Sequence, residues 1–269
     1  MVSVERLEVG EPALVLPLRT RNIKLVVEYD GTDFCGFQRQ PGRRTVQGEL
    51  ERALCRIAKE PVRIAGAGRT DAGVHALGQV VSLRTACRIP VERVCVAANS
   101  LVGKDLATQS AEEAPEGFHA RFSALSRTYR YTILNSEMPS ALLRRFAHWV
   151  NAPLSVEPME AAAEYLKGTH DFASFCASGM DACGTVRQLL ELRVVRVSDL
   201  IVLTMQANAF LRSMARIISG TLIEVGIGKR TPEDIKWILA AKDRGRAGRT
   251  APPCGLCLMS VEYPPETGP

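Results

Sequence analysis

A carboxylate stands at the centre of a glycine-rich stretch, residues 66–79, and this is the part of the chain best suited to chemistry. Four glycines occur within thirteen residues, and Asp71 lies between the second and the third. Glycine adopts positive φ at little cost and leaves room beside the backbone, so another molecule could approach this carboxylate closely. Apolar runs at residues 62–65 and 80–83 predict a strand on each side. We therefore expect Asp71 on a loop held at both ends by a sheet, a favourable position for a catalytic acid.

An aspartate beside glycines also occurs in plain turns, where its side chain caps backbone N–H groups. The longer string GRTDAGVHA at residues 68–76, however, closely resembles the catalytic motif of the tRNA pseudouridine synthases of the TruA family. Further segments resemble motifs of that family, in the family's order, at residues 29–32, 36–40, 45–47, 118–124, 127–131 and 208–216. Phe37 stands where the family usually has tryptophan, which keeps an aromatic face and loses the indole donor. Together the resemblance covers about residues 23–263.

The resemblance implies a fold and an activity. The expected fold is α+β, the pseudouridine-synthase fold, in which two similar α/β halves share a continuous mixed, mostly antiparallel sheet with helices packed on it and a central active-site cleft. The expected reaction is the isomerisation of uridine to pseudouridine at positions 38, 39 and 40 in the anticodon stem-loop of tRNAs. The expected assembly is a homodimer that holds the tRNA across both subunits. The sequence does not specify which of these positions, or which tRNAs, are modified.

Side chains from distant motifs are expected to meet in the cleft. The resemblance pairs Asp71 with Tyr129 and Arg216, and it adds Arg69 as a residue that fills the space left by the flipped nucleotide. The reaction breaks the N1–C1′ bond, turns the uracil and joins C5 to C1′ without redox change, so it requires no cofactor or metal. A carboxylate could attack C1′, attack C6, or remove the 2′ proton to form a glycal, and the residues do not choose among these routes.

The partners of Asp71 also have plainer interpretations. Tyr129 offers a flat face for the extracted uracil and a hydroxyl for proton transfer, but the alternating pattern around it equally fits a core strand. Arg216 could orient Asp71 and balance its charge, or it could lie on a helix surface. His75 is close to the motif, but the reaction does not require a histidine, so we interpret it as structural.

Strand and helix patterns place these motifs in two similar halves. Residues 23–29 alternate between apolar and polar, as a half-buried strand does. A helical pattern follows over residues 46–57, with Thr45 as its N-cap and Pro61 beyond its end. A second helix is expected over residues 91–101. With the strands around the glycine-rich loop, the first half has the order β-α-β-β-α-β.

The second half repeats this plan. Its expected elements are a strand at 128–134, a helix at 158–167 closed by Gly168, a hairpin of 189–197 and 201–207, a helix at 211–225, a helix opened by Thr231 and Pro232, and a strand at 255–263. No linker rich in Pro, Gly or Ser separates the halves, which predicts one shared sheet. The expected divisions are an extension of unknown role (1–22), an N-terminal half (23–115), a C-terminal half (116–263) and a tail (264–269).

The charge pattern favours a polyanionic partner weakly. The net charge is +5, and 27 of the 34 basic residues are arginine, the side chain that grips phosphate bidentately. The loop at residues 30–44 interleaves Phe34 and Phe37 with polar and basic residues, a composition that suits binding a polyanion whose bases can stack. We expect this loop to bind tRNA through Arg39, Arg43 and Arg44. A solvated loop pinned by its phenylalanines is the alternative. A second phosphate-binding cluster is expected at Arg244, Arg246 and Arg249.

The remaining features bear on the compartment. The apolar runs are too short to span a bilayer, and residues 1–22 lack the basic start and long apolar core of a secretory signal. We therefore expect a cytoplasmic protein with no membrane partner. Eight cysteines without a framework are expected to stay reduced. Cys254 and Cys257 have metal-like spacing but lack a good second pair, so core thiols are expected there rather than zinc.

Other functional classes fit less well. An RNA-binding protein that had kept the fold without the chemistry would not need Asp71, Tyr129 and Arg216 intact. A retaining glycosidase would need a second carboxylate close to Asp71, and none accompanies the motif. A phosphoryl-transfer enzyme would need a phosphate-binding loop or metal ligands, and the sequence shows neither.

Overall fold

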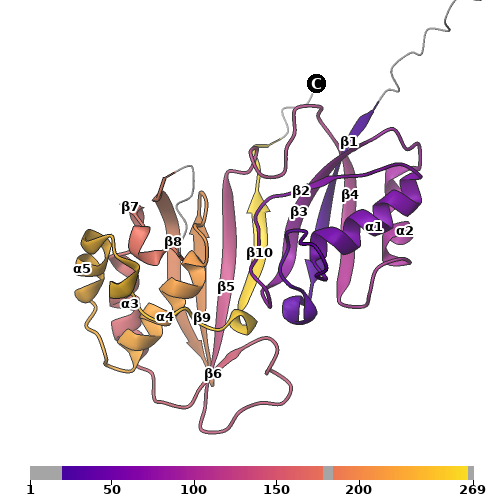
Figure 1. The fold of residues 1–269 in the computed structure, drawn as a ribbon. Coiled ribbons are helices and arrows are strands. Elements are labelled where there is room, and N and C mark those ends of the chain that lie inside the picture. Colours follow the sequence, from indigo (N-terminus) through magenta and orange to yellow (C-terminus); the bar gives the residue numbers. More distant parts are fainter. Residues whose placement is uncertain (1–19, 178–183, 266–269) are drawn as a thin grey trace, which may run out of the picture.

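One mixed sheet runs through the described part of the chain. The structure, a computed structural model, describes residues 20–177 and 184–265. Within these residues ten strands form a single sheet in the order β4-β1-β3-β10-β5-β9-β8-β7, with β2 beside β3 and β6 beside β5 (Figure 1). Most of the expected N-terminal extension and tail, residues 1–19 and 266–269, lies outside the described residues.

The elements follow the order expected from the sequence. The strands are β1 (Arg21–Tyr29), β2 (Ile64–Gly66), β3 (His75–Thr85), β4 (Leu106–Ala114), β5 (Ser126–Asn135), β6 (His148–Val150), β7 (Gly168–Asp171), β8 (Val186–Val197), β9 (Leu200–Ala207) and β10 (Leu256–Glu262). The helices are α1 (Val46–Ala58), α2 (Val91–Asn99), α3 (Val156–Glu164), α4 (Met214–Gly226) and α5 (Asp234–Ala241). The run β1, α1, β2, β3, α2, β4 matches the plan expected for the first half.

The last strand joins the two halves. β10 pairs in parallel with β3, where Cys257 lies opposite His75, and antiparallel with β5, where Leu258 lies opposite Tyr129. Figure 1 shows β10, in yellow, at the centre of the sheet between these strands. The other parallel pair is β5 with β6, and the remaining pairs among the described strands are antiparallel. The expectation of one continuous, mixed and mostly antiparallel sheet is therefore confirmed.

Local geometry sets the helix starts. Thr45 caps α1 as expected, because its hydroxyl accepts a hydrogen bond from the Gly48 N–H at 3.2 Å. α3 begins two residues before the expected Pro158, which lies in the first turn, where its missing N–H costs no helical hydrogen bond. α4 begins at Met214 rather than Leu211, because Ser213 has a left-handed φ of 58° that a helix cannot continue.

The last helix also begins later than the sequence suggested. The Thr231 N–H donates to the Asp234 carboxylate at 2.9 Å, and residues 231–233 form a turn before α5. The residue at the N-cap of α5 is Glu233, so the expected N-cap at Thr231 is wrong. β6 and β7, of three and four residues, were not expected, because such short strands carry too few residues for a periodic pattern.

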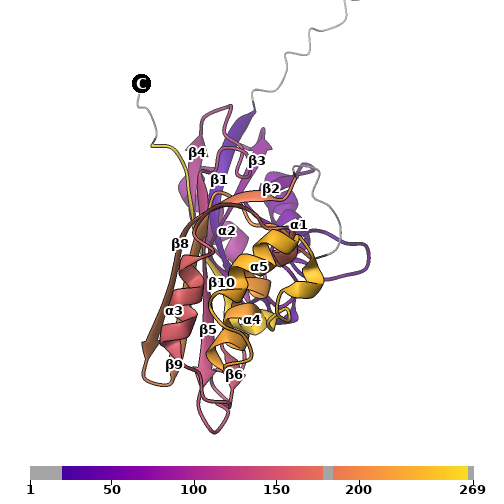
Figure 2. The ribbon, with the colours of Figure 1, turned by 90° about the vertical axis from the view of Figure 1, so that its left-hand side faces the viewer.

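The helices leave one face of the sheet open. Figure 2 shows α1, α4 and α5 on one side of the strands. Side chains of β9 alternate between buried and half-buried, so the helix side of the sheet forms the core. On β8, Val195 is 49% exposed and Val197 is 61% exposed. Among the described residues, every helix is too short or too polar to cross a membrane.

Candidate active site

Asp71 lies on the loop between β2 and β3, as the flanking apolar runs predicted. The N-terminal loop packs against it, because the Phe37 N–H donates to the Thr70 carbonyl at 3.0 Å. This contact needs glycine at position 36, where φ is +86° and a Cβ would lie 2.9 Å from the same carbonyl oxygen. The two glycine-rich segments of the sequence therefore hold one another in place.

The base of the loop is fixed by buried polar groups. The Tyr29 hydroxyl and the Thr70 hydroxyl are hydrogen-bonded at 2.8 Å, and burial raises the pKa of Tyr29 to about 12. The Gln79 amide donates to the Gly68 carbonyl at 2.8 Å. Such bonds leave the backbone before Asp71 little freedom, because each buried group would lose its partner if the loop moved.

Among the described residues, two side chains donate hydrogen bonds to the Asp71 carboxylate, and both reach the same oxygen. Arg216 Nη1 lies 2.8 Å from Asp71 Oδ2, and the Ser213 hydroxyl donates to the same oxygen at 2.9 Å. Arg216 Nε donates to the Ala251 carbonyl at 2.8 Å, which fixes the orientation of the guanidinium. Oδ1 accepts no hydrogen bond from the residues that the structure describes. The carboxylate is thus oriented through one oxygen while the other stays available to a substrate.

Ser213 belongs to the site, although sequence reasoning missed it. It precedes α4 with φ 58° and ψ 9°, an uncommon conformation for a residue with a side chain. Serine directly before an apolar helical pattern normally indicates an N-cap. Here the hydroxyl makes no capping bond and points to Asp71 instead. The local pattern could have marked Ser213, but its partner is 142 residues away and leaves no local signal.

Tyr129 lies beside this carboxylate on β5, with 6% of its surface exposed. Its ring meets the Phe210 ring edge-on at a centroid distance of 4.9 Å. A Cβ on Gly68 would lie 3.7 Å from the Tyr129 hydroxyl, which makes no hydrogen bond with any described residue. Burial, with smaller contributions from Tyr29 and Asp71, raises the pKa of Tyr129 far above its ordinary value. The side chain is therefore a neutral phenol that can donate a proton or a hydrogen bond.

A second residue that the sequence did not indicate, Arg127, binds the backbone of segments that lead to the site. Its side chain is almost fully buried. The guanidinium donates to the carbonyls of Ala67 at 2.9 Å, Arg121 at 2.7 Å and Asn208 at 2.7 Å. Ala67 leads into the Asp71 loop, and Asn208 follows β9. The Arg127 side chain therefore fixes the backbone of both segments. Arg127 falls within the RTYRY motif at residues 127–131, in which the sequence indicates a role for Tyr129 alone.

The other expected residues near the motif differ in their surroundings. Arg69 is exposed and forms no hydrogen bond or ion pair with the part of the chain that is described. His75 is buried, and its Nδ1 accepts a hydrogen bond from the Gly31 N–H at 3.0 Å. Burial lowers the pKa of His75, so the ring is neutral at neutral pH. These contacts agree with a structural histidine.

The loop at residues 30–44 departs from the base-stacking expectation. Phe34 and Phe37 are each only 3% exposed, so their rings belong to the core and cannot stack on bases. The Arg44 guanidinium binds both carboxylate oxygens of Asp105, at 2.6 and 2.9 Å, and lies 4.1 Å over the Phe34 ring. Arg39 and Arg43 remain exposed. The phenylalanines therefore pin the loop, as the alternative interpretation held.

The two cysteines with metal-like spacing lie just before β10 and on it. Cys254 and Cys257 are half-buried, and burial raises the pKa of the Cys257 thiol to about 11. Within residues 20–177 and 184–265, no three His, Cys, Asp or Glu side chains are placed to hold a metal ion. The only other pair that the sequence suggested, a poor one, is Cys176 with Cys183, and Cys183 lies outside the described residues.

Comparisons with known proteins agree with the geometry. The family model for tRNA pseudouridine synthase matches residues 25–123 and 162–264. The tRNA pseudouridine synthase A of Bacillus pumilus is 47% identical over 90% of this chain and 98% of its own length. Those of Bacillus subtilis and Caldicellulosiruptor bescii are 45% and 43% identical, over 90% of this chain and 98% and 100% of their own lengths. The chain belongs to the tRNA pseudouridine synthase family.

Proposed function

We propose that this chain isomerises uridine to pseudouridine in tRNA with Asp71 as the catalytic carboxylate. The observation that carries the proposal is the one-sided binding of that carboxylate. Arg216 and Ser213 both donate hydrogen bonds to Oδ2. Oδ1 accepts no hydrogen bond from any described residue. A carboxylate that served only as a turn cap would instead accept hydrogen bonds from the backbone of its own loop. The family of the chain and the names of its relatives support the same reaction.

The residues divide the reaction between them. Oδ1 of Asp71 is the oxygen that attacks C1′ or C6, or removes the 2′ proton, and these three routes stay open. Arg216 holds the carboxylate against the rotation that would bring Oδ2 forward. The flat ring of Tyr129 accommodates the turned uracil, and its neutral hydroxyl serves as a donor. The N1–C1′ bond breaks and C5 joins C1′, after which the C5 proton leaves to solvent and N1 gains a proton, so the product is an isomer and no other reactant is consumed.

We further propose that the target uridines lie at positions 38, 39 and 40 of the anticodon arm, and that the enzyme works as a cytoplasmic homodimer. The motif resemblance supports the target positions and the homodimer. The open face of β8, where Val195 and Val197 are about half exposed or more, offers apolar surface for a second copy. Arg69 is free to enter the space that a flipped nucleotide vacates.

The direct test measures tritium release from tRNA labelled at uracil C5, because the C5 proton is lost in every route. Wild-type protein should release tritium, and sequencing of the product should place pseudouridine at positions 38 to 40. Release without modification at these positions would retain the isomerase and overturn the site assignment. Absence of release from folded protein that binds tRNA would overturn the proposed function itself. Sedimentation of the protein, with and without tRNA, tests the homodimer.

A further inference from the structure

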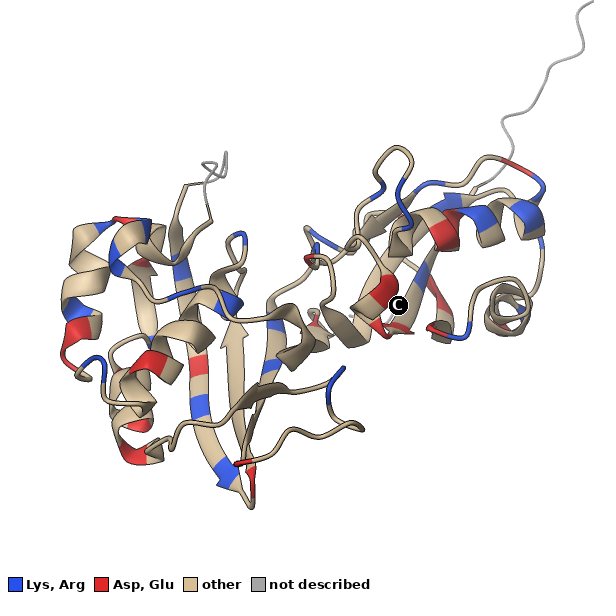
Figure 3. Cartoon of the chain, turned by 60° about the horizontal axis from the view of Figure 1, so that its bottom comes forward, with Lys and Arg blue, Asp and Glu red and all other residues tan. Residues whose placement is uncertain are grey.

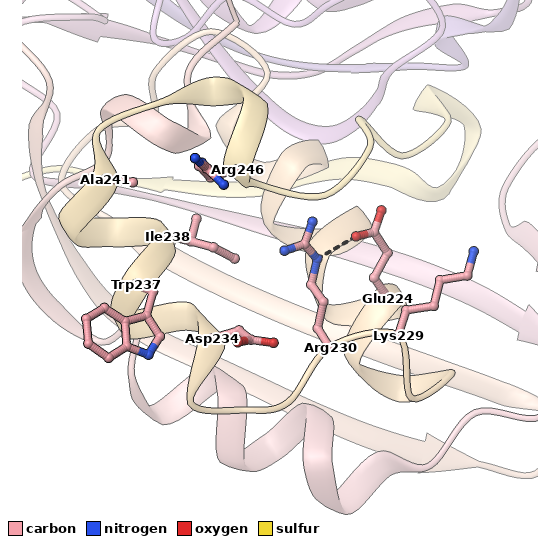
Figure 4. A pocket seen from close by; sticks show the side chains of 8 residues that line it. All are labelled: Glu224, Lys229, Arg230, Asp234, Trp237, Ile238, Ala241 and Arg246. Carbon is pink, nitrogen blue, oxygen red and sulfur yellow. Dashed lines mark hydrogen bonds and ion pairs between the residues drawn. The ribbon is translucent and has the colours of Figure 1, made fainter.

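A large open hollow lies between the end of α4 and the helix α5. Its volume is about 770 Å³, within the range of ligand-binding pockets. Figure 4 shows Trp237 at its edge, with Arg230, Asp234 and Arg246 around it. Trp237 is 74% exposed, although tryptophan is usually well covered in folded proteins. We call this region the α5 hollow, and nothing in the reaction at Asp71 uses it.

The acidic groups of the α5 hollow are already engaged, while its arginines are not saturated. Glu224 accepts hydrogen bonds from Arg230 Nε at 2.6 Å and from the Arg249 N–H at 3.0 Å. Burial alone would raise the pKa of Glu224, but these partners help to lower it below its ordinary value. Asp234 accepts the Thr231 N–H. Arg230 uses only Nε in the bonds that the described residues make, which leaves the terminal nitrogens of its fork for an anion. Arg246, which is exposed, lies 3.9 Å from Asp243 and retains its other donors.

The charge balance around the hollow also favours an anion. Residues 224–249 contain seven Lys or Arg against four Asp or Glu. Figure 3 shows that Lys and Arg are otherwise spread over both halves and interspersed with acids. A basic rim beside an exposed indole suits a nucleotide, because the phosphate binds the arginines while the base stacks on the ring. A peptide partner would more often bring apolar anchors to an apolar pocket.

A tightly packed segment connects the α5 hollow to the catalytic end of α4. Residues 247–251 run along the helix, and a Cβ on Gly220 would lie 1.8 Å from the Arg249 carbonyl oxygen. The Gly248 N–H donates to the Thr221 hydroxyl at 2.9 Å, and the Ala251 N–H donates to the Arg216 carbonyl at 3.1 Å. Arg216 and Glu224 are eight residues apart on one helix, or about 12 Å. The hollow is therefore held at a fixed distance from Asp71.

We propose that the α5 hollow binds one unpaired nucleotide of the tRNA whose uridine reacts at Asp71. Trp237 stacks on the base, and Arg230 and Arg246 hold the adjacent phosphates. This proposal rests on the proposed function. A second fixed contact beyond the far end of α4 sets the register of the tRNA, so that the target uridine is presented to Asp71. Stacking accepts any base, which suits an enzyme that acts on several tRNAs.

The two tryptophans of the chain provide a direct test. Trp149, 41% exposed on β6 with its indole N–H bonded to the Ser136 carbonyl at 3.0 Å, lies on another element and can be replaced by phenylalanine. In Trp149→Phe, all tryptophan emission comes from Trp237. We expect added tRNA to quench this emission and to protect it from iodide. The matched variant Trp237→Phe, in which Trp149 alone emits, should show neither effect.

Binding and turnover measurements complete the test. Trp237→Ala should weaken tRNA binding about tenfold, while Trp237→Phe keeps most of the affinity. The single-turnover rate at saturating tRNA should stay near that of wild type in both. Arg246→Ala should weaken binding and also reduce the dependence of binding on salt. Trp237→Ala should weaken binding without changing its salt dependence. The isolated anticodon stem-loop should quench the emission if the nucleotide belongs to that arm, and only whole tRNA should do so if it lies elsewhere.

Several outcomes would overturn the proposal. Trp237 emission that tRNA leaves unchanged would show that no base stacks there. Emission that changes with protein concentration in the absence of RNA would assign the hollow to a second copy of the chain. Normal tRNA affinity in Trp237→Ala would likewise exclude the contact. Because wild-type tritium release is measured on the same tRNA, failure of this inference is distinguishable from failure of the proposed function.

Discussion

The two ends of α4 show how differently a catalytic site and a binding surface use arginine. At the start of the helix, Arg216 donates to Asp71 and to the Ala251 carbonyl, so its position is fixed by two partners. Beyond the other end, Arg230 follows the helix and is held through Nε alone, and Arg246, on a later segment, is exposed. A reacting carboxylate must be positioned before the substrate arrives, because misplacement costs rate directly. A surface that grips a polyanion needs unused donors more than fixed geometry.

Asp71→Asn should have the largest effect, because it separates catalysis from tRNA binding. The amide keeps the size of the side chain and can still accept from Arg216, so the fold and the basic surface should persist. We expect tRNA binding to survive and turnover to fall by several orders of magnitude, with about 1.4 kcal/mol of barrier for each tenfold loss. Tritium release and filter binding on one preparation measure both quantities.

The Asp71→Asn preparation must be free of carboxylate at position 71. Mass spectrometry should show that the amide has not hydrolysed back to the carboxylate and that no wild-type protein is present. If the pure amide variant still released tritium at a comparable rate, Asp71 would be a turn residue and the chemistry would lie elsewhere.

Tyr129→Phe separates stacking from proton transfer. The variant keeps the ring, which packs against Phe210, and removes a hydroxyl that has no hydrogen-bond partner among the described residues. We expect unchanged tRNA affinity and a single-turnover rate lower by about two to four orders of magnitude, as is typical of general acid–base groups. Because burial raises the pKa of Tyr129, the wild-type rate should show no ionisation of this phenol up to about pH 10. A near-normal rate in the variant would leave Tyr129 as a platform only.

Arg216→Gln tests the charged partner of the carboxylate. Glutamine can still donate a hydrogen bond but loses the charge and the planar fork, so Asp71 Oδ2 keeps a weaker partner. A charge-assisted hydrogen bond typically contributes about 1.5–3 kcal/mol, which corresponds to a loss of roughly ten- to a hundredfold in the single-turnover rate. Affinity for tRNA should fall much less than the rate does. Equal losses in both would indicate that Arg216 contacts the tRNA rather than positioning Asp71.

Ser213→Ala and Ser213→Asn form a matched pair at the same oxygen. Alanine removes the donor to Asp71 and retains the strained left-handed backbone, whereas asparagine tolerates that backbone and carries an amide donor. We expect about a tenfold loss of rate in the alanine variant and a smaller loss in the asparagine variant. Thermal unfolding provides the control. If asparagine raised stability without restoring rate, the hydroxyl would matter for the backbone of α4 and not for the carboxylate.

Sequence patterns anticipated local features much better than long-range contacts. The Thr45 cap and the strands around Asp71 depend on residues within a few positions of one another, so the sequence contains the whole signal. The Asp105 partner of Arg44 is 61 residues away, and the carbonyls held by Arg127 are up to 81 residues away. No periodic pattern encodes such pairs, which arise only when the sheet brings distant loops together. The sequence left the burial of Phe34 and Phe37 as one of two alternatives for the same reason, because the chain that covers them comes from other segments.

The smallest expected effect separates two neighbouring arginines. The side chain of Arg43 forms no hydrogen bond or ion pair within the described ranges, whereas Arg44 is held by Asp105 and by the Phe34 ring. Arg43→Ala should therefore reduce the slope of log affinity against log salt by about 0.7–0.9, the contribution of one phosphate contact, without changing stability. Arg44→Ala should leave the slope nearly unchanged and lower the free energy of unfolding by up to about 1 kcal/mol, since the pair is partly exposed. An unchanged slope in Arg43→Ala would remove this residue from the tRNA interface. A flattened slope in Arg44→Ala at normal stability would mean that tRNA draws Arg44 away from Asp105.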